Sequence, residues 1–132
     1  MTFLFLDDDC AARAPLAEAL AQKYGRLADA WAAGWYPSHV RAEVRAVLEE
    51  EGIRPQGLRA RSVSAVPLEE VQVVVSFVPD AAPLLLSEGV VRRTWAIPDP
   101  SCAPPAERLD AYRAARDEIT RRLKILLAEV DR

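Results

Sequence analysis

The sequence has no long apolar run and few cysteines. The apolar run near its start, residues 3–6, is short and leads directly into three aspartates, which does not fit a signal peptide. No run approaches the ~20 residues that cross a bilayer. With only two cysteines in the chain, free thiols are the default expectation. These absences predict a cytoplasmic protein that has no membrane partner.

A strong net charge is also missing. The 17 basic and 20 acidic residues leave a formal charge of -3, which is too weak to draw the chain onto phosphate backbones or anionic membranes. Nucleic acid is therefore not an expected partner. The chain shows no internal repeat, and 51% hydrophobic with 28% charged residues is the balance of a soluble globular protein. We expect one domain over residues 1–132.

Hydrophobic patterning predicts strands that alternate with helices. Apolar, β-branched runs indicate four strands, at residues 2–6, 28–33, 71–77 and 90–97. Helical spacing of apolar residues, with proline near the start and glycine near the end, indicates helices from Pro15 and from Pro37. A short helix at about 81–87 and a long one after the loop 98–105 complete the pattern. This order is typical of an α/β domain with a parallel sheet.

Two loops of the predicted sheet carry polar side chains. Ligands of parallel α/β sheets bind at the carboxyl ends of the strands. Residues 7–14 follow the first predicted strand, and residues 98–102 follow the last one. We therefore expect a functional site where these two loops meet.

The first of these loops resembles part of a known family. Residues 3–20 read FLFLDDDCAARAPLAEAL, which is similar to the signature of the low-molecular-weight tyrosine phosphatases and arsenate reductases: a strand, Cys-x5-Arg-(Ser/Thr)-Pro and a helix. Weaker matches follow in the family's order, namely WAAG at 31–34, His39 before a helix that ends in Gly52 and Ile53, Arg61-Ser62, the strand 71–77 and Asp99-Pro100. The resemblance covers nearly the whole chain. It implies a flavodoxin-like, three-layer α/β sandwich with a four-stranded parallel sheet of order 2-1-3-4.

The resemblance also implies a role for each residue of the loop. In that family the loop wraps an oxyanion with backbone N–H groups, an arginine grips two of its oxygens, a cysteine attacks phosphorus, and the aspartate of an Asp-Pro pair protonates the leaving group. Arg13 and Asp99 match the arginine and the acid, and Asp7 stands at the cysteine position. The anion-binding loop then consists of Asp8, Asp9, Cys10, Ala11, Ala12, Arg13 and Ala14.

The departures from the family fall on the chemical part of the motif. A carboxylate is a weaker nucleophile than a thiolate, and an added like charge ~4 Å from an anion costs about 1 kcal/mol in water and about 4 at an effective dielectric of 20. Asp9 and Cys10 occupy the family's glycine and asparagine positions, and Ala14 stands where a Ser or Thr lowers the cysteine's pKa. Residues 78–86 lack the resolving cysteines of the arsenate reductase branch. We expect a binding or regulatory relative that lacks cysteine-based catalysis, needs no cofactor and takes a small anion or a phosphorylated ligand.

Other interpretations of the acidic loop stay open. Carboxylates at a helix N-terminus stabilise that helix by about 0.3–1 kcal/mol each, with no ligand involved. A divalent cation held by Asp7, Asp9 and Asp99 is another hypothesis, since hard cations prefer clustered oxygens. The alternative function is an active phosphatase with Asp7 as nucleophile and a divalent metal, because Asp7-x-Asp9 after an apolar strand also resembles haloacid-dehalogenase-type phosphatases. The downstream lysine and acidic motifs of that second family are missing.

The two cysteines form one further candidate pair. In the fold that the resemblance implies, the first loop and the Asp-Pro loop face each other, which predicts that Cys10 lies near Cys102 as a disulfide or redox pair. Two unconnected thiols are the simpler expectation for a cytoplasmic chain. Both interpretations are carried forward.

Overall fold

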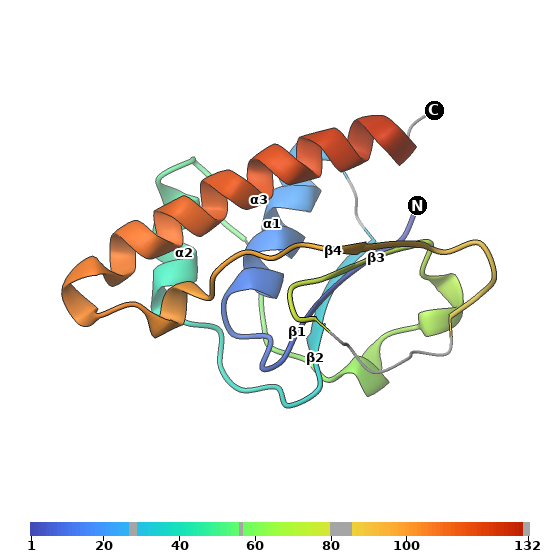
Figure 1. Ribbon diagram of the computed structural model, residues 1–132, viewed down its shortest axis with the longest axis horizontal. Coiled ribbons are helices and arrows are strands. Elements are labelled where there is room, and N and C mark those ends of the chain that lie inside the picture. The colour runs from blue at the N-terminus through green and yellow to red at the C-terminus, as the bar shows by residue number, and fades with distance from the viewer. Residues whose placement is uncertain (27–28, 56, 80–85, 131–132) are drawn as a thin grey trace.

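Four parallel strands form the centre of the fold (Figure 1). The computed structural model describes residues 1–26, 29–55, 57–79 and 86–130. The strands are β1 (Phe3–Asp7), β2 (Ala30–Gly34), β3 (Val73–Ser76) and β4 (Val91–Thr94), and they pair in the order β2-β1-β3-β4. The predicted α/β architecture and the strand order 2-1-3-4 are confirmed.

The central strand β1 is buried on both of its faces. Phe3 and Phe5 belong to the apolar cluster on one side of the sheet, and Leu4 and Leu6 belong to the cluster on the other side. A parallel strand that is covered on both sides needs apolar residues at every position, which explains the unbroken run. The run ends with Asp7, the last residue of β1, at the carboxyl edge of the sheet.

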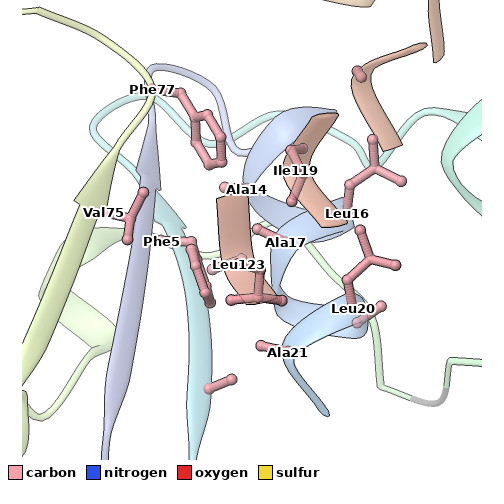
Figure 2. Close-up of a cluster of buried hydrophobic side chains, with 14 of the residues drawn as sticks. Phe5, Ala14, Leu16, Ala17, Leu20, Ala21, Val75, Phe77, Ile119 and Leu123 are labelled. Atoms are coloured by element: carbon pink, nitrogen blue, oxygen red, sulfur yellow. The ribbon is translucent and has the colours of Figure 1, made fainter. Parts of the chain in front are cut away.

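Three α-helices pack on the face of the sheet that Phe3 and Phe5 occupy. They are α1 (Arg13–Tyr24), α2 (Ala42–Glu49) and α3 (Arg108–Val130). Figure 2 shows Phe5 and Val75 of the sheet facing Ala17 of α1 and Leu123 of α3. Among the described residues, no helix combines the length and the apolar content that crossing a bilayer requires.

Short 3-10 helices complete the chain. On the face of Leu4 and Leu6, Val63 and Leu68 pack from two of them, η1 (Val63–Ala65) and η2 (Leu68–Glu70). Two more, η3 (Pro100–Cys102) and η4 (Pro105–Glu107), lead from the last strand into α3. The helix expected at about 81–87 falls mostly outside the described residues.

The prediction that the second helix begins at Pro37 is wrong, because α2 begins at Ala42. Residues 36–41, which we call the strap, run along the loop between β1 and α1. The N–H groups of Tyr36, Ser38 and Arg41 donate to carbonyl oxygens of that loop at 2.8 to 2.9 Å. Contacts with a segment far away in sequence therefore delay the start of the helix. The strap brings the beginning of α2 to the carboxyl edge of the sheet.

Candidate functional site

Hydrogen bonds from the strap to backbone carbonyl groups shape the loop between β1 and α1, residues 8–12. Its carbonyl oxygens at Asp8, Asp9 and Ala11 accept from the strap. Cys10 has a φ of 52°, a left-handed conformation that asparagine tolerates better than most residues. The side chain of Cys10 is fully buried in the main apolar cluster, and this packing stabilises the conformation. Cys10 thus holds a left-handed turn in the middle of the loop.

Gly34 at the end of β2 lets the loop pass directly over the sheet edge. A Cβ atom on Gly34 would lie 2.8 Å from the carbonyl oxygen of Asp8, 2.9 Å from that of Asp7 and 2.9 Å from the backbone nitrogen of Cys10. All three neighbours are backbone atoms, which cannot move aside without moving the loop. The glycine of the WAAG segment is therefore required by close approach.

Asp7 and Arg13 form a bidentate ion pair beneath this loop. Arg13 Nε donates to Asp7 Oδ2 at 2.7 Å, and Arg13 Nη2 donates to Asp7 Oδ1 at 2.7 Å. The residues are only 3% and 8% exposed, so water does not compete for the contact. Two parallel charge-assisted hydrogen bonds between a guanidinium and a carboxylate are among the strongest polar contacts in proteins.

The remaining partners of this pair also come from the protein. Arg13 Nη1 donates to the carbonyl oxygen of Ile97 at 2.6 Å, and the guanidinium lies 5.8 Å from the centre of the Phe77 ring. The backbone N–H of Asp8 donates to Asp7 Oδ1 at 2.9 Å. The Asp7 carboxylate thus receives a guanidinium fork and a backbone N–H, the same donors that this type of loop offers to an oxyanion.

Each charge of the pair depends on the other. Burial raises the pKa of the Asp7 carboxyl, and the hydrogen bond and charge of Arg13 oppose that rise. Burial lowers the pKa of Arg13, but the hydrogen bond and charge of Asp7 outweigh this effect, so the pKa of the guanidinium is raised. Removal of either partner leaves the other buried and unpaired, which is the costly state of such a pair.

The other predicted acidic residues have protein partners of their own. Asp9 Oδ1 accepts from the backbone N–H of Ala11 at 3.2 Å. Asp99 Oδ1 accepts from the N–H of Ser101 at 3.0 Å and from its hydroxyl at 2.7 Å, so it caps η3. The charge of Asp99 contributes to the raised pKa values of both Asp7 and Arg13, which indicates that the Asp-Pro loop faces the same edge.

The structure does not assemble the cation site proposed from Asp7, Asp9 and Asp99. Within the described ranges, no group of three or more His, Cys, Asp or Glu side chains is arranged to hold a metal ion. Cys10 and Cys102 are both free thiols, the first buried and the second exposed. Burial raises the pKa of the Cys10 thiol to about 11, and the negative charge of Glu18 acts in the same direction. Pairing of the two thiols stays a prediction.

A second buried ion pair was missed by sequence reasoning. Glu18 of α1 is 4% exposed and accepts from Arg61 Nη1 at 2.5 Å and from the backbone N–H of Ala32 at 3.0 Å. The Arg61 guanidinium also lies 5.3 Å from the centre of the Trp31 ring. The available signal was a single glutamate among alanines and leucines of α1. Through Glu18 this pair links α1 to β2.

Comparison with known proteins agrees with this geometry. The family model described as low molecular weight phosphotyrosine protein phosphatase matches residues 2–132. An arsenate reductase in the phosphate binding state shares 24% identity and a TM-score of 0.78, with 98% of each chain covered. An arsenate reductase from Archaeoglobus fulgidus DSM 4304 shares 25% identity and a TM-score of 0.78, covering 96% of this chain and 99% of the other.

A third solved structure, the YwlE arginine phosphatase from Geobacillus stearothermophilus, shares 20% identity and a TM-score of 0.75, covering 98% of this chain and 92% of the other. No curated protein matches the sequence. The family match spans nearly all residues, and the sheet order and the position of the loop after β1 agree with it. The chain therefore belongs to the low molecular weight phosphotyrosine protein phosphatase family.

Proposed function

We propose that this chain is a binding relative of the phosphatases in which Asp7 replaces the nucleophilic cysteine and fills the anion site. The observation that carries the proposal is the bidentate contact of Asp7 with Arg13, in which both nitrogen–oxygen distances are 2.7 Å. A carboxylate offers this arginine the paired oxygens and the negative charge of an oxyanion. The loop therefore holds an anion that is part of the chain.

An external phosphate group has to displace this carboxylate in order to reach Arg13. Because Asp7 is covalently attached, it gives up little translational freedom when it occupies the site. Separation of a buried pair costs about 3–5 kcal/mol. At about 1.4 kcal/mol for each factor of ten, this cost lowers the affinity of the Arg13 site for phosphate by about 10²–10⁴-fold.

Asp7 is also poorly disposed to act as a nucleophile. Both of its oxygens accept hydrogen bonds from Arg13, and Oδ1 accepts a further one from the N–H of Asp8. Lone pairs that are engaged by charged donors are not free to attack phosphorus. Asp8, Asp9 and Asp99 add negative charge around the same edge and repel an incoming dianion.

Hydrolysis of p-nitrophenyl phosphate tests the proposal directly. The wild-type chain and Asp7→Asn should both show no turnover above buffer, with or without Mg²⁺. Circular dichroism confirms that both proteins are folded, and Asp110→Asn serves as a control, because it changes an exposed aspartate in the same way. Turnover that requires both Mg²⁺ and Asp7 would overturn the proposal in favour of an aspartate nucleophile with a divalent metal.

Asp7→Cys tests the same proposal from the opposite direction. It restores the sulfur nucleophile and removes the internal carboxylate, but Asp9 and Ala14 keep their departures from the family motif. We expect little turnover from this single variant and more from the triple variant Asp7→Cys, Asp9→Gly, Ala14→Ser. A triple variant that is folded and inactive would show that more than the loop chemistry separates this chain from active relatives.

A further inference from the structure

A polar cavity lies beside the strap, and neither Asp7 nor Arg13 lines it. It has a volume of about 540 Å³, and its lining comes from the end of the strap, the start of α2, η3 and the start of α3. The residues that matter for its chemistry are His39, Arg41, Glu43, Ser101, Arg108 and Tyr112. We call this cavity the α2 pocket. The proposed function of the Asp7 loop leaves it unexplained.

Tyr112 gives the pocket a buried hydroxyl without a partner. The residue is 0% exposed, and its hydroxyl oxygen has no hydrogen-bond partner within the part of the chain that the structure describes. Buried polar groups are nearly always satisfied, so an orphaned hydroxyl beside a cavity points to a group that is bound there. Burial raises the pKa of Tyr112 to about 12, and Glu43 adds to the rise. The hydroxyl is therefore a hydrogen-bond donor at neutral pH.

The start of α2 contributes a second set of donors. The helix begins at Ala42 with Arg41 as its N-cap residue, and no side chain caps its first turn. Uncapped N–H groups at a helix N-terminus, together with the helix dipole, favour an anion. The backbone N–H of Arg41 donates to the carbonyl oxygen of Ala11 at 2.9 Å, which fixes the backbone of Arg41 against the loop. Arg41 also lines the pocket.

The charge of the lining is positive. Arg41 and Arg108 outnumber Glu43. Arg108 is oriented by hydrogen bonds from Nε and Nη2 to the carbonyl oxygen of Ala103, at 3.3 and 3.2 Å. The pocket thus has donors from three elements. They are Arg41 on the strap, the first turn of α2, and Arg108 with the hydroxyl of Tyr112 on α3.

We propose that the α2 pocket binds a phosphate group, held by Arg41, Arg108, the first turn of α2 and the hydroxyl of Tyr112. The proposal goes beyond the function argued for the Asp7 loop, because it uses residues outside that loop. It assigns the ligand-binding role of this relative to a pocket whose lining carries two arginines and one glutamate. The ligand class is a phosphate monoester or inorganic phosphate.

Titration of the ¹⁵N-labelled protein with inorganic phosphate tests the proposal, with sodium chloride at matched ionic strength as the reference. We expect saturable shifts of the backbone N–H signals of residues 40–43 and 101–103. Arg41→Gln should weaken the affinity by about tenfold, the usual effect of losing a charge-assisted contact. Arg92→Gln, which removes an equal charge from exposed β4, should leave it within twofold.

Tyr112→Phe separates a binding role from a merely structural one. If the hydroxyl donates to phosphate, the variant should bind phosphate about three- to tenfold more weakly while the free protein becomes no less stable. Unchanged phosphate affinity in this variant would overturn the assignment of Tyr112.

The location of the shifts distinguishes the two proposals. Saturable shifts at residues 40–43, with an affinity that Arg41→Gln weakens about tenfold, support the α2 pocket. Saturable shifts confined to residues 8–14 would overturn both this inference and the internal-anion proposal. The absence of saturable shifts at either place would overturn the pocket and leave the internal-anion proposal standing.

Discussion

Neutralisation of Asp7 should convert Arg13 into a site that depends on external anions. In Asp7→Asn the side-chain shape is kept, but Arg13, a residue that is only 8% exposed, loses its counter-charge. Removal of one partner of a buried pair costs about 3–5 kcal/mol. We expect the lower end, about 3 kcal/mol, because the amide oxygen still accepts one hydrogen bond.

For a chain of this length the loss corresponds to a fall in Tm of about 10–15 °C. Phosphate should then return most of it, because a ligand that binds only the folded state at one hundred times its Kd adds about 2.7 kcal/mol. Thermal unfolding of the wild type and of Asp7→Asn, each in a phosphate series at constant ionic strength, measures both effects. The comparison of the two proteins cancels binding elsewhere, including in the α2 pocket.

Two results would refute this reasoning. If Asp7→Asn unfolds at the wild-type temperature, the pair is not the buried, interdependent contact described above. The second result is a variant that is less stable and yet gains no more stability from phosphate than the wild type does. In that case removal of the Asp7 carboxylate has not opened an anion site at Arg13. Asp110→Asn, which neutralises a carboxylate in an exposed ion pair, should leave Tm nearly unchanged and serves as the control.

Three further predictions concern the surroundings of the site. Gly34→Ala should destabilise the protein by about 1–3 kcal/mol in urea unfolding, since its Cβ would overlap backbone atoms of the loop; a neutral result would contradict the close approach. Hydrogen bonds from Arg113, and then from Arg116 of α3, lower the pKa of Glu50 to about 2. The contribution of Glu50 to stability is therefore present above pH ~4.5 and lost as the pH falls towards 2. Glu50→Gln should flatten this part of the plot of stability against pH, and an unchanged plot would contradict the contact. A thiol reagent should label the exposed Cys102 rapidly and the buried Cys10 slowly. Loss of both thiols after mild oxidation would instead support a disulfide between them.

The inner strands β1 and β3 could be predicted because they are buried on both faces. Such strands need apolar side chains at consecutive positions, so the runs around Phe5 and Val75 identify them without knowledge of their neighbours. The start of α2 could not be predicted in the same way. Its position depends on hydrogen bonds between the strap and a loop that lies far away in the sequence. Local signals such as Pro37 carry no information about that contact.

The place of the functional site was also visible in the sequence, but its internal contacts were not. Asp7 and Arg13 were expected at one edge of the sheet, with the arginine directed at an external anion. The pattern does not tell whether a guanidinium contacts a ligand or a neighbouring carboxylate six residues away, because that depends on the course of the loop. Glu18 and Tyr112 were missed for a related reason, since each lies on a helix face whose other residues are apolar.

The strap has a consequence for how this protein could change over evolutionary time. Its hydrogen bonds to the loop involve only main-chain atoms of the loop, at Asp8, Asp9 and Ala11. Substitutions at these positions therefore leave the strap's hydrogen bonds in place, because those bonds use no side chain of the loop. A lineage can exchange the reactive groups of such a turn one by one and still inherit a folded protein. New chemistry can be tried there without first inventing a new scaffold.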